Sequence, residues 1–110
     1  MIVALPTETS GEKSFISEHF GRSNFYYIYN TETATGEVFI NPFKDAQGGA
    51  GIKASEFILE HKTDVLITPR VGEKALRVFK SSAIVMYKST DKIVKENIAS
   101  FLNKELELLF

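Results

Sequence analysis

The sequence contains no cysteine, and only 2 of its 110 residues are histidine. The missing thiols exclude disulfide bonds, thiolate zinc sites, thiolate-ligated iron–sulfur clusters and cysteine nucleophiles. A bound metal would therefore need histidine, carboxylate or backbone ligands. His19 and His61 are consequently the first residues to consider as ligands.

Long apolar runs are lacking as well, since no stretch reaches the roughly 18 apolar residues of a membrane-spanning helix. The first six residues are apolar, but they are too few for a signal peptide, have no basic leader and end at Pro6. We therefore expect a strand over residues 2–5, a cytoplasmic protein and no membrane partner.

The sequence also has no large excess of positive or negative charge. Lysine and arginine total 13 against 14 aspartate and glutamate, which gives a net charge of -1. A chain without a basic field is a poor ligand for a phosphate backbone, so we expect no nucleic-acid partner. The length, the 44% apolar and the 25% charged residues are typical of one globular domain, here residues 1–110.

Apolar runs and stripes predict strands alternating with helices. A helical stripe from Ala50 to His61 follows a turn, a short helix follows Gly72, and a last helix runs from Asp91, as its N-cap, to Asn103 in a left-handed conformation. Its inward stripe would be Val94, Ile98, Phe101 and Leu102. The predicted strands are 2–5, 25–29, 37–41, 65–68 and 83–87.

This order of elements favours an α/β architecture. Strands that alternate with helices form a mostly parallel sheet covered on both faces, and the hairpin at residues 25–41 would add an antiparallel strand to give a mixed sheet. Ligands of such sheets gather beyond the carboxyl ends of the parallel strands. Three loops should meet there, at residues 6–22, 68–72 and 87–90.

These loops would give the cleft a positive rim. The first brings His19, Gly21 and Arg22, the second brings Arg70 and Gly72, and the third brings Lys88. A locally positive rim suits a small anionic ligand even when the net charge is near zero.

Structural roles for the same residues stay open. His19 is as well explained by a structural hydrogen bond, and Arg22 and Arg70 by solvated surface charges. His61, at the end of a helix stripe, favours a structural role. The glycines at residues 48–51 favour a flexible turn, because no Lys-Ser or Lys-Thr follows them as in a P-loop.

Catalytic patterns are missing. The first strand carries no carboxylate for a metal ion, and there is no Gly-x-Ser-x-Gly or Gly-x-Gly-x-x-Gly element. We therefore favour a binding protein over an enzyme.

The segment Ile16-Ser17-Glu18-His19-Phe20-Gly21-Arg22, after an Ile-Val-Ala-Leu-Pro-Thr strand, resembles the opening of a known family. This is the dinitrogenase iron–molybdenum cofactor biosynthesis family, which includes NifX and the C-terminal part of NifB. The His-Phe-Gly-Arg element is the most specific match. The likeness continues at Phe25, Ile28, Gly49-x-Gly51, residues 64–67, Gly72-x-x-Ala75, residues 84–87 and the closing helix before Leu106.

The resemblance implies a three-layer α/β/α fold of the ribonuclease H-like type. It also implies a non-catalytic protein that transiently binds or carries an iron–sulfur or iron–molybdenum-type cluster, with a cluster-donor or cluster-acceptor protein as partner. Carried onto this sequence, it makes His19 the metal ligand, with Gly21, Arg22, Arg70 and Gly72 available to hold the cluster's negative charge.

Two other functions remain as alternatives. One is a metal-free protein-interaction or regulatory module, whose contact surface would be the apolar tail at residues 106–110. The other is a hydrolase that binds a small anion at the same rim.

Overall fold

Nine elements follow one another in the computed structural model, which describes residues 1–110. In chain order they are β1 (Ile2–Thr7), the 3₁₀ helix η1 (Phe20–Arg22), β2 (Phe25–Asn30), β3 (Thr35–Ile40), α1 (Ala50–Glu60), β4 (Val65–Thr68), α2 (Glu73–Lys80), β5 (Val85–Lys88) and α3 (Val94–Leu102). No helix among them combines the length and the hydropathy that spanning a bilayer requires.

The five strands form one mixed sheet in the order β3-β2-β1-β4-β5. β1 pairs with β2, and β2 with β3, in antiparallel fashion, with Leu5 opposite Tyr27. β1 and β5 both run parallel to β4, with Leu66 opposite Met86. The predicted mixed α/β sheet is confirmed. Four strands run in one direction and only β2 runs against them, so "mostly parallel" holds for strand direction. Of the four strand pairings, two are parallel and two are antiparallel.

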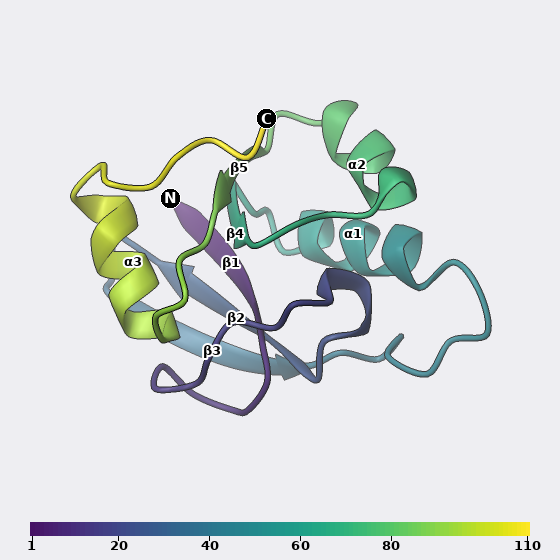
Figure 1. Ribbon diagram of the computed structural model, residues 1–110, viewed down its shortest axis with the longest axis horizontal. Coiled ribbons are helices and arrows are strands. Elements are labelled where there is room, and N and C mark those ends of the chain that lie inside the picture. Colours follow the sequence, from purple (N-terminus) through teal and green to yellow (C-terminus); the bar gives the residue numbers. More distant parts are fainter.

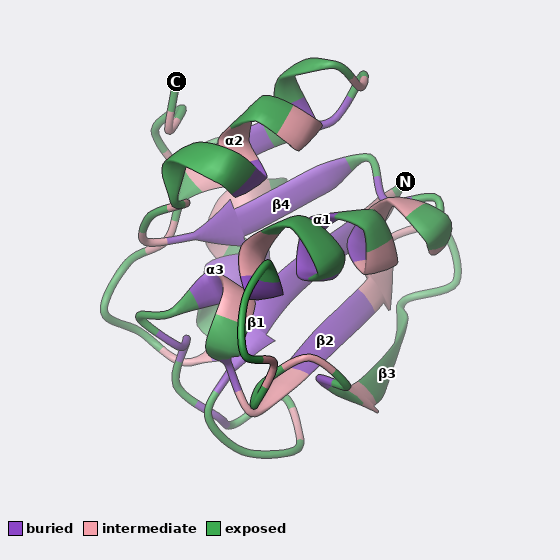
Figure 2. Cartoon of the chain, turned by 90° about the vertical axis from the view of Figure 1, so that its right-hand side faces the viewer, coloured by how far each residue is buried: buried purple, intermediate pink, exposed green.

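Helices cover both faces of this sheet, with α1 and α2 on one side and α3 on the other (Figure 1). Each face has its own apolar core, and the central strands are buried between them (Figure 2). Ala54, Ile58 and Phe79 fill the first core, while Val94 and Ile98 fill the second. This is the three-layer, ribonuclease H-like arrangement that the resemblance implied.

Proline does not end the first strand, contrary to the sequence prediction. Pro6 lies inside β1 opposite Tyr26. Even-numbered residues of β1 direct their backbone groups toward β4, since Ile2 O accepts a bond from Asp64 N at 2.8 Å. β4 pairs only as far as Ala4. The missing N–H of Pro6 therefore lies on the β4 side and leaves the β1–β2 ladder intact, whereas the β1–β4 pairing ends before it. Pro6 O accepts from Ser17 N at 2.8 Å.

The start of α3 also differs from the prediction. Its N-cap is Ile93, which provides no side-chain cap, so the expected Asp91 cap is wrong. Backbone carbonyls of the loop before η1 take its place: Val94 N donates to Ser14 O and Lys95 N to Glu12 O, both at 2.8 Å. A distant loop therefore satisfies the free N–H groups that a capping side chain usually satisfies.

At the other end of α3, Lys104 rather than Asn103 adopts the left-handed conformation, with φ of 60°. Leu102 is 51% exposed and does not belong to the inward stripe. The tail then runs beside β5 (Figure 1), where Lys88 N donates to Glu107 O and Leu109 N to Met86 O. This pairing covers the β5 edge of the sheet.

The buried phenol of Tyr26 links the core to η1. It should also make the free energy of unfolding depend on pH in the alkaline range. Tyr26 is completely buried, and its hydroxyl donates to Phe20 O. Burial raises the pKa of Tyr26 well above its usual value. Above about pH 10 the unfolded chain loses this proton while the folded chain keeps it, so the free energy of unfolding should fall by up to about 1.4 kcal/mol per pH unit.

Urea unfolding of wild type and Tyr26→Phe across this alkaline range measures the effect. In Tyr26→Phe the free energy of unfolding should fall less steeply with pH than in wild type. Some decline should remain, because burial, with a smaller contribution from the Glu12 charge, also raises the pKa of Tyr27. Parallel curves for the two proteins would contradict the assignment to Tyr26.

Candidate functional site

A pocket of about 600 Å³ opens beyond the carboxyl end of β4, between η1 and the N-terminal ends of α1 and α2. The five residues that the resemblance assigned to the site all line it. The lining consists of Glu18, His19, Phe20, Gly21, Arg22, Gly49, Ala50, Gly51, Ile52, Arg70, Gly72, Glu73, Lys74 and Ala75.

The third predicted loop does not reach this pocket. Lys88 lies in a neighbouring cavity, which shares Glu18 and Arg70 with the first one. The start of α1 takes its place, although the sequence had suggested only a flexible turn there. Gly49 has a left-handed φ of 70° as the N-cap of α1, and it lines the pocket together with Gly51. The Gly49-x-Gly51 spacing ahead of a helical stripe was the available signal.

Two helices direct free backbone N–H groups at the pocket. The first N–H of α1 to bond within the helix is that of Lys53, which donates to Gly49 O, and the first of α2 is that of Leu76, which donates to Gly72 O. The N–H groups of residues 50–52 and 73–75 thus have no backbone partner. At α3, by contrast, loop carbonyls occupy two such groups. The pocket therefore offers two helix N-termini to an anion.

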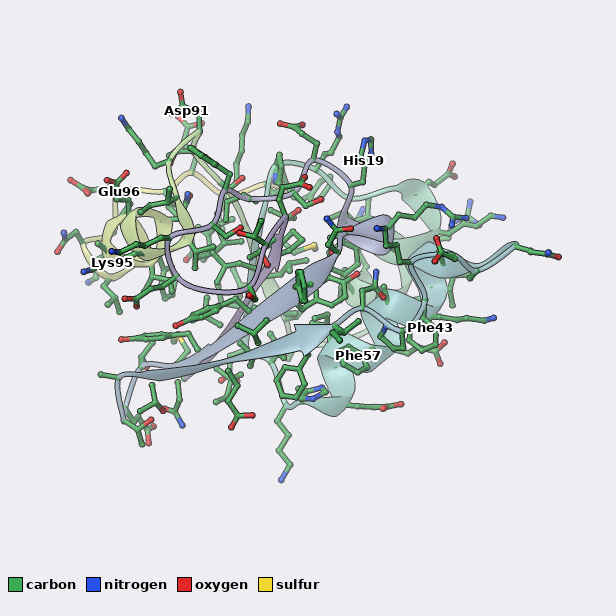
Figure 3. All side chains as sticks on the ribbon, turned by 90° about the horizontal axis from the view of Figure 1, so that it is seen from below. His19, Phe43, Phe57, Asp91, Lys95 and Glu96 are labelled. Carbon is green, nitrogen blue, oxygen red and sulfur yellow. The ribbon has the colours of Figure 1, made fainter.

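His19, the metal ligand that the resemblance implied, lies at the edge of this pocket. His19 is the N-cap of η1, and its backbone N–H donates to Ser17 Oγ at 3.2 Å. Its imidazole is exposed, makes no hydrogen bond within the protein and projects outward from the turn (Figure 3). A neutral imidazole with a free lone pair can ligate a metal.

Cations outnumber free carboxylates around the pocket. Arg22 donates through Nη1 to Lys44 O at 2.8 Å and has no carboxylate partner, and neither does Lys74. Arg70 pairs with Glu18 at 3.1 Å. Both side chains of that pair are about two-thirds exposed (68% and 65%), so the ion pair contributes little to stability. Arg70 can therefore exchange the carboxylate of Glu18 for an anionic ligand.

Glycine brings η1 against the first turn of α1. A Cβ on Gly21 would lie 2.9 Å from Gly51 Cα and 3.1 Å from Gly51 N, closer than real side chains approach backbone. The two segments, 30 residues apart, thus meet through their backbones. This contact sets the distance between His19 and the free N–H groups of α1.

The other histidine has a structural role, as the sequence predicted. Its Nδ1 lies 2.9 Å from Phe57 O, and its ring packs against Phe39 and Phe57 with centroids 4.5 and 4.6 Å away. His61 lies outside the pocket.

The donor set fits an anionic cluster better than a bare metal ion. No group of three or more histidine, cysteine, aspartate or glutamate side chains is arranged to hold a metal ion. One imidazole, unpaired cations and backbone N–H groups instead combine a single metal–ligand bond with many contacts to negative charge.

Comparison with known proteins identifies relatives of the whole chain. The model of the family described as dinitrogenase iron-molybdenum cofactor matches residues 1–104. An uncharacterised protein of Methanocaldococcus jannaschii is 30% identical over 110 residues, which cover 97% of this chain and 90% of that one.

Solved structures of similar proteins share the fold. A candidate NifB protein from Thermotoga is 30% identical, with a TM-score of 0.86 over 98% of this chain and 92% of the other. The apo form of the orange protein of Desulfovibrio gigas has a TM-score of 0.91 at 23% identity, over 97% of this chain and 91% of that one. At that identity the likeness establishes the fold alone.

Proposed function

The chain belongs to the dinitrogenase iron-molybdenum cofactor family, as the resemblance predicted, and we propose that it binds and carries an anionic iron–sulfur-type metallocluster without transforming it. Membership connects the chain with the biosynthesis or binding of that cofactor. One observation carries the finer proposal: the unpartnered imidazole of His19 lies at a pocket on which two helix N-termini converge.

Each group at the pocket has a distinct task in this proposal. The imidazole of His19 supplies the one bond to a metal of the cluster. Arg22, Lys74 and the N–H groups of α1 and α2 offset the cluster's negative charge. Gly21 and Gly72 add no side chain, so the cargo can approach the backbone closely.

Attachment through one side chain implies weak and reversible binding. That property suits a carrier, which receives its cargo from one protein and releases it to another. Ligation would use the free lone pair of the neutral His19 imidazole. A protein that donates or accepts the cluster is the partner that this function requires.

Paramagnetic broadening of amide signals can locate the cargo. Anaerobic addition of a synthetic iron–sulfur cluster to the ¹⁵N-labelled protein should broaden the signals of residues 18–22, 49–52 and 70–75. Signals of the tail at residues 106–110, the contact surface of the alternative interaction module, should persist. Broadening centred on the tail, or no saturable change at all, would overturn the proposal.

Charge neutralisation at the Glu18–Arg70 pair gives a second test. In Glu18→Gln, Arg70 becomes free for the ligand and one repulsive carboxylate disappears, so affinity for the cluster should rise by about two- to fivefold. The matched control is Glu32→Gln, since Glu32 also forms an exposed ion pair, with the Met1 amino group at 3.5 Å. An equal rise in both variants would point to net charge rather than to the pocket.

A further inference from the structure

Three carbonyl oxygens in and next to η1 accept hydrogen bonds from buried side chains. Phe20 O accepts a hydrogen bond from the hydroxyl of Tyr26. Gly21 O and Ser23 O both accept from the side-chain amide of Asn41, each at 3.0 Å. Asn41 follows the last residue of β3 and is only 4% exposed. One buried amide therefore holds both sides of the turn.

The orientation of this amide is fixed by a third bond. The backbone N–H of Phe43 donates to Asn41 Oδ1 at 2.9 Å, and an N–H group can donate only to the oxygen of the amide. The NH₂ group must then face the two carbonyls of the turn. All hydrogen-bonding groups of the side chain thus have defined partners.

These bonds have an electrostatic consequence for the pocket. A carbonyl oxygen carries partial negative charge and repels an anion, whereas N–H groups and guanidinium attract it. Because Asn41 and Tyr26 draw three carbonyls inward, the turn presents the side chains of His19 and Arg22 to the pocket. The segment after Asn41 also holds Arg22, whose Nη1 donates to Lys44 O.

We propose that Asn41 is a positioning residue of the ligand site, which makes the η1 turn receptive to an anion by holding the carbonyls of Gly21 and Ser23 away from the pocket. This inference rests on the proposed binding of an anionic cluster. Asn41 acts through the turn and does not touch the cargo. Its contribution should therefore appear as a change in ligand affinity and in the signals of His19 and Arg22.

The chain offers a matched control in Asn97. Asn97 is completely buried in α3, on the opposite face of the sheet. Its amide donates to Lys92 O and Ile93 O at 2.9 and 3.1 Å, and its Oδ1 accepts from Thr90 N at 2.8 Å. In both asparagines the NH₂ group thus donates to two backbone carbonyls and the oxygen accepts from a backbone N–H, but only Asn41 is bonded to a residue that lines the pocket.

Asn41→Asp and Asn97→Asp can be compared directly. Each replaces the amide by a group of the same shape that cannot donate when ionised, so both should lower the urea midpoint. Only Asn41→Asp should weaken binding of a synthetic iron–sulfur cluster in an anaerobic titration, by at least about tenfold. Asn41→Ala, which adds no charge, should weaken it in the same direction and serves if Asn41→Asp does not fold.

A ligand-free measurement separates this inference from the proposed function. In the NMR spectra of the unliganded proteins, Asn41→Asp should shift the ring signals of His19 and the side-chain signals of Arg22, and Asn97→Asp should leave both unchanged. Unshifted signals in Asn41→Asp, or cluster binding as tight as that of wild type, would overturn the positioning role. Failure of the wild-type protein to bind the cluster would instead count against the proposed function.

Discussion

Replacing Phe20 by alanine is expected to lower the free energy of unfolding by about 3–5 kcal/mol, the usual cost of deleting a buried aromatic ring. Phe20 is the first residue of η1, and it is only 4% exposed. Its ring packs against Tyr26 and Phe79 with both centroids 5.5 Å away. The candidate site is thus anchored to the core by the same three-residue helix that displays Arg22.

Phe15→Ala is the matched control for this experiment. Phe15 belongs to the same long connection between β1 and β2, but its side chain is 62% exposed. Its removal should change the free energy of unfolding by about 0.5 kcal/mol or less. Urea unfolding of the three proteins gives the comparison. Equal costs for the two phenylalanines would show that η1 is not anchored through its ring.

Local patterns in the sequence were sufficient for most of the fold. The apolar run at residues 65–68 is observed as β4 with the same ends, because a buried strand bounded by proline has few alternatives. The stripe from Ala50 to His61 is likewise observed as α1, with His61 just beyond its last residue.

The misplaced boundaries have a common cause in contacts between distant segments. Pro6 continues β1 because it pairs with β2 through a ladder that does not use its missing N–H, and α3 begins without a side-chain cap because Ser14 and Glu12 supply carbonyls. Neither partner could be recognised from local sequence. The ends of helices and strands depend on such tertiary contacts more than their centres do.

The candidate site was predictable in its residues but not in its construction. His19, Arg22 and Arg70 were recognisable because their side chains can bind a metal or an anion. The contribution of Gly51 depends on a backbone contact with Gly21, and that of Asn41 on bonds across 18 and 20 residues. Chemistry-bearing side chains can be recognised in a sequence, whereas the groups that position them become evident only in the folded chain.

His19→Ala should abolish most of the cluster binding while leaving the fold intact. The imidazole is exposed and makes no hydrogen bond within the protein, so its loss should change the free energy of unfolding by about 0.5 kcal/mol or less. It is also the one side chain at the pocket that can bond to a metal without carrying charge. We expect affinity to fall by about tenfold or more, equivalent to about 1.4 kcal/mol.

His61→Ala should have the opposite pair of effects. The ring of His61 packs between Phe39 and Phe57, and its Nδ1 lies 2.9 Å from Phe57 O. Its deletion should destabilise the protein by about 1–3 kcal/mol, in the range of a lost buried contact and hydrogen bond. Cluster affinity should stay unchanged, because His61 lies outside the pocket.

An anaerobic titration of wild type, His19→Ala and His61→Ala with a synthetic iron–sulfur cluster shows whether His19 binds the cargo. We expect saturable binding by wild type and His61→Ala, and binding weaker by about tenfold or more in His19→Ala. Equal affinities for all three proteins would remove His19 from the site.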